Sequence, residues 1–190
     1  MNVLIYNYLQ AGESGSGGVG VYIANLAEGL AAARHRVITM SSGDIYALTN
    51  RKPWLRVRRD RYDRAVIVNS PQIATAGDAF DDLRPYTQSD GLDAIPAALR
   101  ERFGAIDVFH FQNLEGLTRS FFERVRAEFP DAKLILSIHN YNVVCPQVDL
   151  WHQDRVVCTN YRHGRGRGSE SALFGLHKAR GNGRPVRVGF

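Results

Sequence analysis

The sequence has no long hydrophobic run, few cysteines and no basic leader, and each absence excludes a class of protein. No stretch of its 190 residues approaches the roughly 18 consecutive apolar residues of a membrane-spanning helix. Met1 and Asn2 carry no basic side chain, and the apolar run at 3–6 is too short for a signal peptide. The sequence therefore predicts a cytoplasmic chain, in which Cys145 and Cys158 stay reduced.

The net positive charge of the chain is concentrated near its end. Residues 155–190 contain eight Lys or Arg and one acidic residue, a net charge of +7. Residues 1–154 contain 16 basic and 18 acidic residues, a net charge of −2. An end rich in Arg and Gly is usually a solvated tail, so 162–190 is predicted to be flexible and no nucleic-acid partner is expected.

Apolar patterning predicts alternating strands and helices. Apolar strands are predicted over 2–8, 36–40, 65–70, 107–111 and 133–139, and amphipathic helices over about 19–34, 92–103 and 117–129. Strand, helix and strand within about 40 residues form a βαβ unit, which implies a parallel sheet. The pattern predicts a Rossmann-like, doubly wound α/β domain over 1–161.

Two segments receive more specific interpretations. Residues 42–63 lack clear periodicity and contain Pro53, so they are interpreted as a loop or an insertion. Their basic run, with Trp54 and Leu55, suits a solvated loop or contact with an anionic membrane surface. Residues 133–139 form a continuous apolar run of the kind that is buried on both faces.

The glycine-rich segment before the first predicted helix differs from two nucleotide-binding motifs. Residues 15–20 match GxGxxG, but about six residues separate Tyr8 from Gly15, whereas a dinucleotide motif follows its strand directly. The second strand ends in Met-Ser-Ser at 40–42, without the acidic residue that would bind a ribose. No Gly-Lys-Ser/Thr follows, which excludes a P-loop.

Polar side chains and glycines cluster where a doubly wound sheet binds ligands, at the carboxyl ends of its strands. Glycines allow close approach of a ligand, and the N–H groups of a helix start attract phosphate. Amides and neutral imidazoles offer both donors and acceptors, which suits a sugar. The candidate substrate-binding residues are Gly17, Gly18, Val19, His110, Asn113, His139 and Asn140. A flexible loop and structural histidines are the alternatives.

Four possible metal ligands do not form a recognised site. Cys145, His152, Cys158 and His163 follow no standard zinc spacing, so no metal is predicted. Thiols that support a loop or are simply buried are the alternative.

Three segments resemble glycosyltransferase family 4, whose members have the two-domain GT-B fold. They are GGVGVYIANLAEGLAAARHRV, IDVFHFQNLEGL and LILSIHNYNVVCPQVDLW, and the resemblance covers about residues 1–160 in the right order. It implies retaining transfer of a hexose from a nucleotide sugar, without a metal or other cofactor. It places Gly17 and Gly18 near the donor phosphates and the acceptor, His139 against the hexose as the catalytic residue, and His110 and Asn113 on the same wall.

The chain departs from this family in length. Family members are roughly twice as long, and their second, nucleotide-binding domain has no counterpart after residue 139. We therefore expect the acceptor-side half of such an enzyme, with a glycan, glycolipid or cell-envelope acceptor and weak affinity for nucleotide sugars. A non-catalytic remnant and a dinucleotide-dependent oxidoreductase are the alternatives.

Overall fold

The computed structural model describes residues 1–9, 17–42, 52–70, 91–139, 151–152 and 156–157. The chain divides into two compact units, and the first contains the sheet and all the described helices. In the second, β7 (Trp151–His152) pairs antiparallel with β8 (Val156–Val157). The predicted domain boundary at 161 lies outside the described residues. None of the described helices combines the length and apolarity that crossing a membrane requires.

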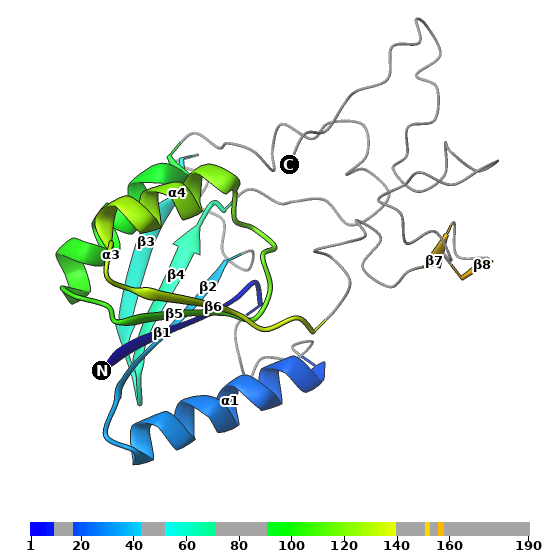
Figure 1. Cartoon of the computed structure of the whole chain (residues 1–190), viewed down its shortest axis with the longest axis horizontal. Helices are drawn as coiled ribbons and strands as arrows, with labels where there is room; N and C mark the ends of the chain where they lie inside the picture. The colour runs from blue at the N-terminus through cyan, green and yellow to red at the C-terminus, as the bar shows by residue number, and fades with distance from the viewer. Residues whose placement is uncertain (10–16, 43–51, 71–90, 140–150, 153–155, 158–190) are drawn as a thin grey trace, which may run out of the picture. The chain divides into compact units, whose positions relative to one another are not determined.

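A six-stranded sheet forms the centre of the first unit, in the order β3-β4-β2-β1-β5-β6 (Figure 1). Its strands are β1 (Asn2–Asn7), β2 (Arg36–Ser42), β3 (Trp54–Arg59), β4 (Asp63–Val68), β5 (Val108–Phe111) and β6 (Lys133–Leu136). All neighbouring pairs are parallel except β3 with β4. The protein therefore has the predicted α/β architecture, a Rossmann-like parallel sheet with one antiparallel strand at its edge.

Helices cover both faces of the sheet, as a doubly wound fold requires. Helix α1 (Gly17–Ala32) lies on one face, and α3 (Ile95–Phe103) and α4 (Arg119–Glu128) lie on the other (Figure 1). A 3₁₀ turn, η1 (Leu92–Ala94), leads into α3. Helix α4 begins after Thr118, whose hydroxyl accepts from the Phe121 N–H at 3.3 Å. This cap explains why the helix starts later than the apolar stripe predicts.

The period-two alternation of the strands builds a separate core on each face. In β1, Val3 and Ile5 pack beneath α1, whereas Leu4 and Tyr6 belong to the larger core beneath α3 and α4. Each fully buried aliphatic side chain contributes about 1.5–3 kcal/mol. The core that contains Val3 and Ile5 fixes α1 against β1, and therefore fixes the start of α1 near the carboxyl ends of the strands.

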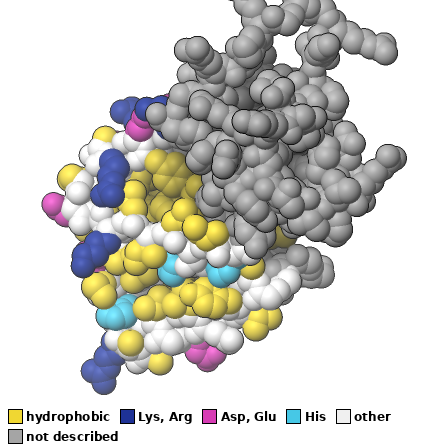
Figure 2. Space-filling model, turned by 45° about the vertical axis from the view of Figure 1, so that its right-hand side comes forward, with side chains coloured by type: hydrophobic (Ala, Val, Ile, Leu, Met, Phe, Trp, Pro, Cys, Tyr) yellow, Lys and Arg dark blue, Asp and Glu magenta, His cyan; other side chains and the backbone are white. Residues whose placement is uncertain are grey.

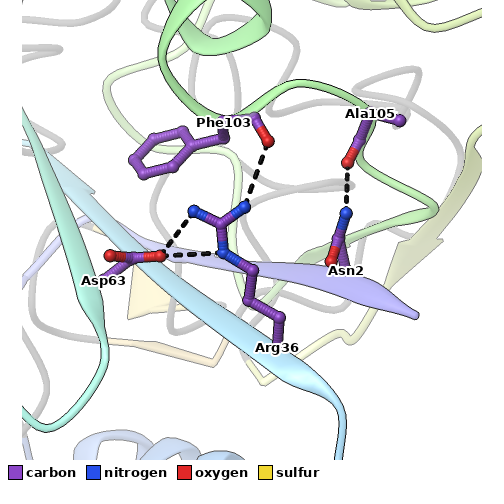
Figure 3. A network of polar contacts seen from close by, with 5 residues as sticks. All are labelled: Asn2, Arg36, Asp63, Phe103 and Ala105. Carbon is purple, nitrogen blue, oxygen red and sulfur yellow. Dashed lines mark hydrogen bonds and ion pairs between the residues drawn. The ribbon is translucent and has the colours of Figure 1, made fainter.

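A polar network joins the amino ends of the strands, opposite the edge where ligands bind in this fold class (Figure 3). Arg36 forms an ion pair with Asp63 at 2.7 Å and donates to the Phe103 carbonyl at 3.1 Å. Asn2 donates to the Ala105 carbonyl at 2.6 Å. These contacts tie β1, β2 and β4 to the end of α3, and they leave the carboxyl ends of the strands open to other roles.

The prediction of a loop over 42–63 is wrong, because β3 lies within it. Leu55 and Val57 pair with Ile67 and Ala65 of β4 and pack against the core beneath α3 and α4. The intervening arginines obscure this two-residue period in the sequence. Pro53 directly precedes the strand, where its missing N–H removes no ladder hydrogen bond.

The prediction that 133–139 is buried on both faces is also wrong. Strand β6 ends at Leu136 and pairs only with β5 in the described sheet. Ile135 and Leu136 are 44% and 41% exposed, because α1 covers the middle of its face and no described strand lies beyond β6. The Ser137 N–H still donates to the Phe111 carbonyl at 2.8 Å, and the chain then leaves the sheet.

Candidate functional site

The start of α1 presents two accessible glycines at the carboxyl ends of the strands. Gly17 and Gly18 are exposed, and a Cβ added to either would meet nothing within 4 Å. Of the two, only position 17 has a backbone conformation that favours glycine, with a φ of +55°. The two glycines are therefore accessible at the first turn of the helix, whose N–H groups favour an anion.

His139 lies just beyond β6 and is held by contacts with two elements. Its Nε2 lies 2.7 Å from Oε1 of Gln112, which follows β5. Its ring meets Tyr22 of α1 edge-on, with 5.2 Å between the ring centroids. Tyr22 is five residues after Gly17, or about 7.5 Å along the helix axis. The structure thus brings His139 close to the glycine-rich helix start.

The contact with Gln112 determines which His139 nitrogen is free. An amide oxygen only accepts, so the His139 Nε2 carries the hydrogen in this bond. In the neutral imidazole, Nδ1 is then the acceptor. His139 is exposed, so this acceptor suits a ligand that carries hydroxyl groups. Figure 2 shows histidine side chains next to hydrophobic side chains on one face of the described part.

Gln112 is a site residue that the sequence analysis missed. Its side chain is wholly buried, and its Nε2 has no hydrogen-bond partner within the described part of the chain. A buried unpaired donor costs about 1–3 kcal/mol. The sequence placed a glutamine after an apolar strand, but it could not show that this glutamine was buried or that it reached the neighbouring strand's histidine.

His110 lies within β5, as the predicted strand over 107–111 implies. Its Nε2 lies 2.8 Å from the Ser137 hydroxyl, and its register neighbours are Ile5 and Ile135. Burial lowers the pKa of His110, and the nearby His139 lowers it further. His110 is therefore a neutral, half-buried histidine that supports the segment leading to His139.

The side chains of Asn113 and Val19 make contacts within the fold. The Asn113 amide donates to Asn7 Oδ1 at 2.8 Å, and its oxygen accepts from the Tyr8 N–H at 3.2 Å. Asn113 thus joins the ends of β1 and β5. Val19 packs against the core beneath α1. Asn140, the remaining candidate, lies outside the described residues.

A second polar cluster joins the carboxyl ends of β1, β2 and β4 to the segment that follows β5. The buried Tyr6 hydroxyl contacts the Ser42 hydroxyl at 2.6 Å and donates to the Glu115 carbonyl. Ser70 donates to the Gly116 carbonyl at 3.0 Å. Gly116 has a φ of +76°, and a Cβ there would lie 3.1 Å from the Ser70 hydroxyl oxygen and closer still to that of Ser42. The cluster makes this part of the edge a rigid turn rather than an open surface.

No metal centre is found among the described residues, where no three His, Cys, Asp or Glu side chains gather. Cys145, Cys158 and His163 lie outside that part of the chain. Of the four possible ligands, only His152 belongs to a described element, the short strand β7.

No family model and no curated protein matches this sequence. Among solved structures, the apo structure of OtsA is similar, with 15% sequence identity and a TM-score of 0.43. The match covers 73% of this chain and 33% of OtsA, so it spans about a third of that protein's length. A likeness of this degree assigns no activity to this chain.

Proposed function

We propose that this chain is the N-terminal, acceptor-side domain of a retaining GT-B glycosyltransferase of the family 4 type. It would transfer a hexose from a nucleotide sugar to a glycan, glycolipid or cell-envelope acceptor. The observation that carries the proposal is the contact between Tyr22 and His139, 5.2 Å between ring centroids. Through it, an anion-favouring helix start and a hydroxyl-binding histidine share one edge of the sheet.

The two parts suit the two ends of a sugar phosphate. The exposed helix start at Gly17 and Gly18 favours the phosphate, because its N–H groups and the helix dipole attract negative charge. His139 contacts Tyr22, which lies about one and a half helical turns further along α1, and offers Nδ1 to a hydroxyl of the hexose. A phosphate and the sugar attached to it can span such a separation.

In the proposed transfer, the bond between the anomeric carbon and the phosphate oxygen breaks, the oxygen of an acceptor hydroxyl bonds to that carbon, and the hydroxyl proton passes to the departing nucleoside diphosphate. A neutral His139 would orient the hexose by accepting a hydrogen bond. The described unit would supply one wall of the cleft, and family resemblance assigns the nucleotide to a second domain. We therefore expect this chain alone to bind nucleotide sugars with a millimolar dissociation constant.

The test is a ligand screen of the chain by ¹⁵N-detected NMR, with UDP-, GDP- and TDP-hexoses against NAD and FAD. The proposal predicts shifts for Gly18 and His139 with at least one nucleotide sugar, and none with NAD or FAD. Shifts caused by NAD or FAD would favour an oxidoreductase instead. Shifts with none of the five ligands, up to the solubility limit of each, would leave the domain a non-catalytic remnant.

A further inference from the structure

The alternation of β3 sorts its side chains onto two faces of the sheet. Leu55 and Val57 pack against the core beneath α3 and α4. Trp54, Arg56 and Arg58 therefore face the opposite side, which is the side of α1. Leu55 does not share a surface with Trp54, so the sequence-based pairing of these two residues at a membrane is wrong.

Two of the arginines on this face lie opposite each other on neighbouring strands. Arg58 lies directly opposite Arg64 of β4 in the antiparallel register. Like charges at opposite positions destabilise a sheet. Within the described part of the chain, Arg56, Arg58 and Arg64 form no ion pair.

Neighbouring arginines are balanced by acids, so the imbalance is local. Arg59, on the other face, lies opposite Asp63, which also binds Arg36 at 2.7 Å. Arg61, in the turn between the strands, pairs with Glu28 of α1 at 2.8 Å. Within the described strands β3 and β4, the α1 side therefore carries Arg56, Arg58 and Arg64 and no acidic residue.

We propose that Trp54, Arg56, Arg58 and Arg64, here called the basic strand face, bind an anionic membrane surface. Arg56 and Arg58 lie two residues apart, or about 7 Å along the strand. Lipid headgroups can supply an anion to each guanidinium. Trp54 is 39% exposed at the end of the row, and tryptophan favours the membrane–water interface.

A nucleic-acid partner fits this face less well. Single-stranded nucleic acid is bound by aromatic side chains on which successive bases stack, interleaved with cations. The basic strand face has a single aromatic residue, at one end of its row. The membrane contact does not depend on the proposed sugar transfer, although both are compatible with a lipid-linked acceptor.

The test is sedimentation with phosphatidylcholine vesicles, prepared with and without phosphatidylglycerol. The triple variant Arg56→Gln/Arg58→Gln/Arg64→Gln should bind the anionic vesicles about a hundredfold more weakly than wild type, at roughly fivefold per arginine. The matched control, Arg102→Gln/Arg124→Gln/Lys133→Gln, removes the same charge from exposed positions elsewhere and should bind like wild type. The triple variant should melt no lower than wild type, because it relieves the Arg58–Arg64 repulsion.

A second readout separates this face from the basic end of the chain, since residues 155–190 carry +7 and could attract vesicles themselves. The chain has two tryptophans, so Trp151→Phe leaves Trp54 as the sole reporter. Its emission should shift to shorter wavelength with anionic vesicles only. Equal binding by the triple variant and wild type, equal loss in the control, or unchanged Trp54 emission would each overturn the proposal. Binding to poly(U) RNA without binding to vesicles would overturn it too.

Discussion

Replacement of Gln112 by methionine should separate stability from site geometry. The change removes one hydrogen bond to His139, which contributes about 1 kcal/mol. It also removes a wholly buried amide whose Nε2 has no partner in the described structure, a defect that costs about 1–3 kcal/mol. Methionine is flexible and of similar length, so it should leave little cavity. The net effect on the free energy of unfolding should lie between about zero and +2 kcal/mol.

The higher stability of Gln112→Met should be accompanied by a less ordered His139 ring. In wild type, the bond to Gln112 keeps the hydrogen on Nε2. In Gln112→Met, the ring should sample both tautomers, and the affinity for a sugar ligand should fall about fivefold, the equivalent of one hydrogen bond. Such a combination, higher stability with weaker binding, is typical of a residue kept for function.

Thermal melting and ¹⁵N NMR of the histidine side chains measure the two effects. The melting temperature should be no lower than that of wild type, and up to about 6 °C higher. Ser137→Ala is the matched control: it removes a hydrogen bond from the same segment but keeps Gln112, so the hydrogen should stay on Nε2 of His139. A loss of more than about 2 kcal/mol in Gln112→Met would show that the residue is structural. If wild-type His139 carried its hydrogen on Nδ1, Gln112 would have to be the donor, and the assignment of Nδ1 as the free acceptor would be wrong.

Three further predictions concern the glycines and His110. Gly18→Ala should raise the helix stability by up to about 1 kcal/mol, since the added Cβ meets nothing within 4 Å, and it should weaken the binding of phosphate-containing ligands. Thermal melting with ligand titration measures both effects, and unchanged binding would remove Gly18 from the site. Gly116→Ala should cost about 2–4 kcal/mol in denaturant unfolding, because it combines positive φ with a clash at Ser42; a cost below 1 kcal/mol would show that the turn can relax. Burial lowers the pKa of the folded-state His110, so the unfolded chain binds more protons below about pH 6.5; stability should fall as the pH drops through that value. His110→Asn should flatten this part of the curve, and an equally steep curve in the variant would assign the effect to another group.

The sequence predicted the parallel units well because their signals are local. The apolar run of β1, the helical stripe of α1 and the strand at Arg36–Ser42 each identify themselves within about ten residues. Strand β3 was missed because arginines occupy its outward positions, so the two-residue period depends on Leu55 and Val57 alone. Burial of β6 was overestimated because a sequence does not show whether a strand has one neighbour or two.

The candidate site was only partly predictable, for a related reason. The position of His139 near the carboxyl end of a strand could be predicted from the order of elements, although β6 ends at Leu136 and not at His139. Its partners could not, because Gln112 is 27 residues away and Tyr22 belongs to another element. Asn113 looked like a ligand-binding residue, but both of its polar groups bind neighbouring backbone and side-chain atoms. The residue type predicted that these side chains could form hydrogen bonds, but the fold determined whether the partner is a ligand or another part of the protein.

In the proposed function, His139 and the start of α1 together hold a nucleotide sugar by its hexose and its phosphate. Saturation-transfer NMR tests this most directly, because it reports which protons of a weakly bound ligand touch the protein. With the nucleotide sugar that shifts His139, wild type should saturate the hexose protons. His139→Ala should lose that saturation while its melting temperature stays within about 2 °C, since an exposed side chain adds little packing. Unchanged hexose saturation in His139→Ala, or a destabilised variant that still binds normally when folded, would contradict the account.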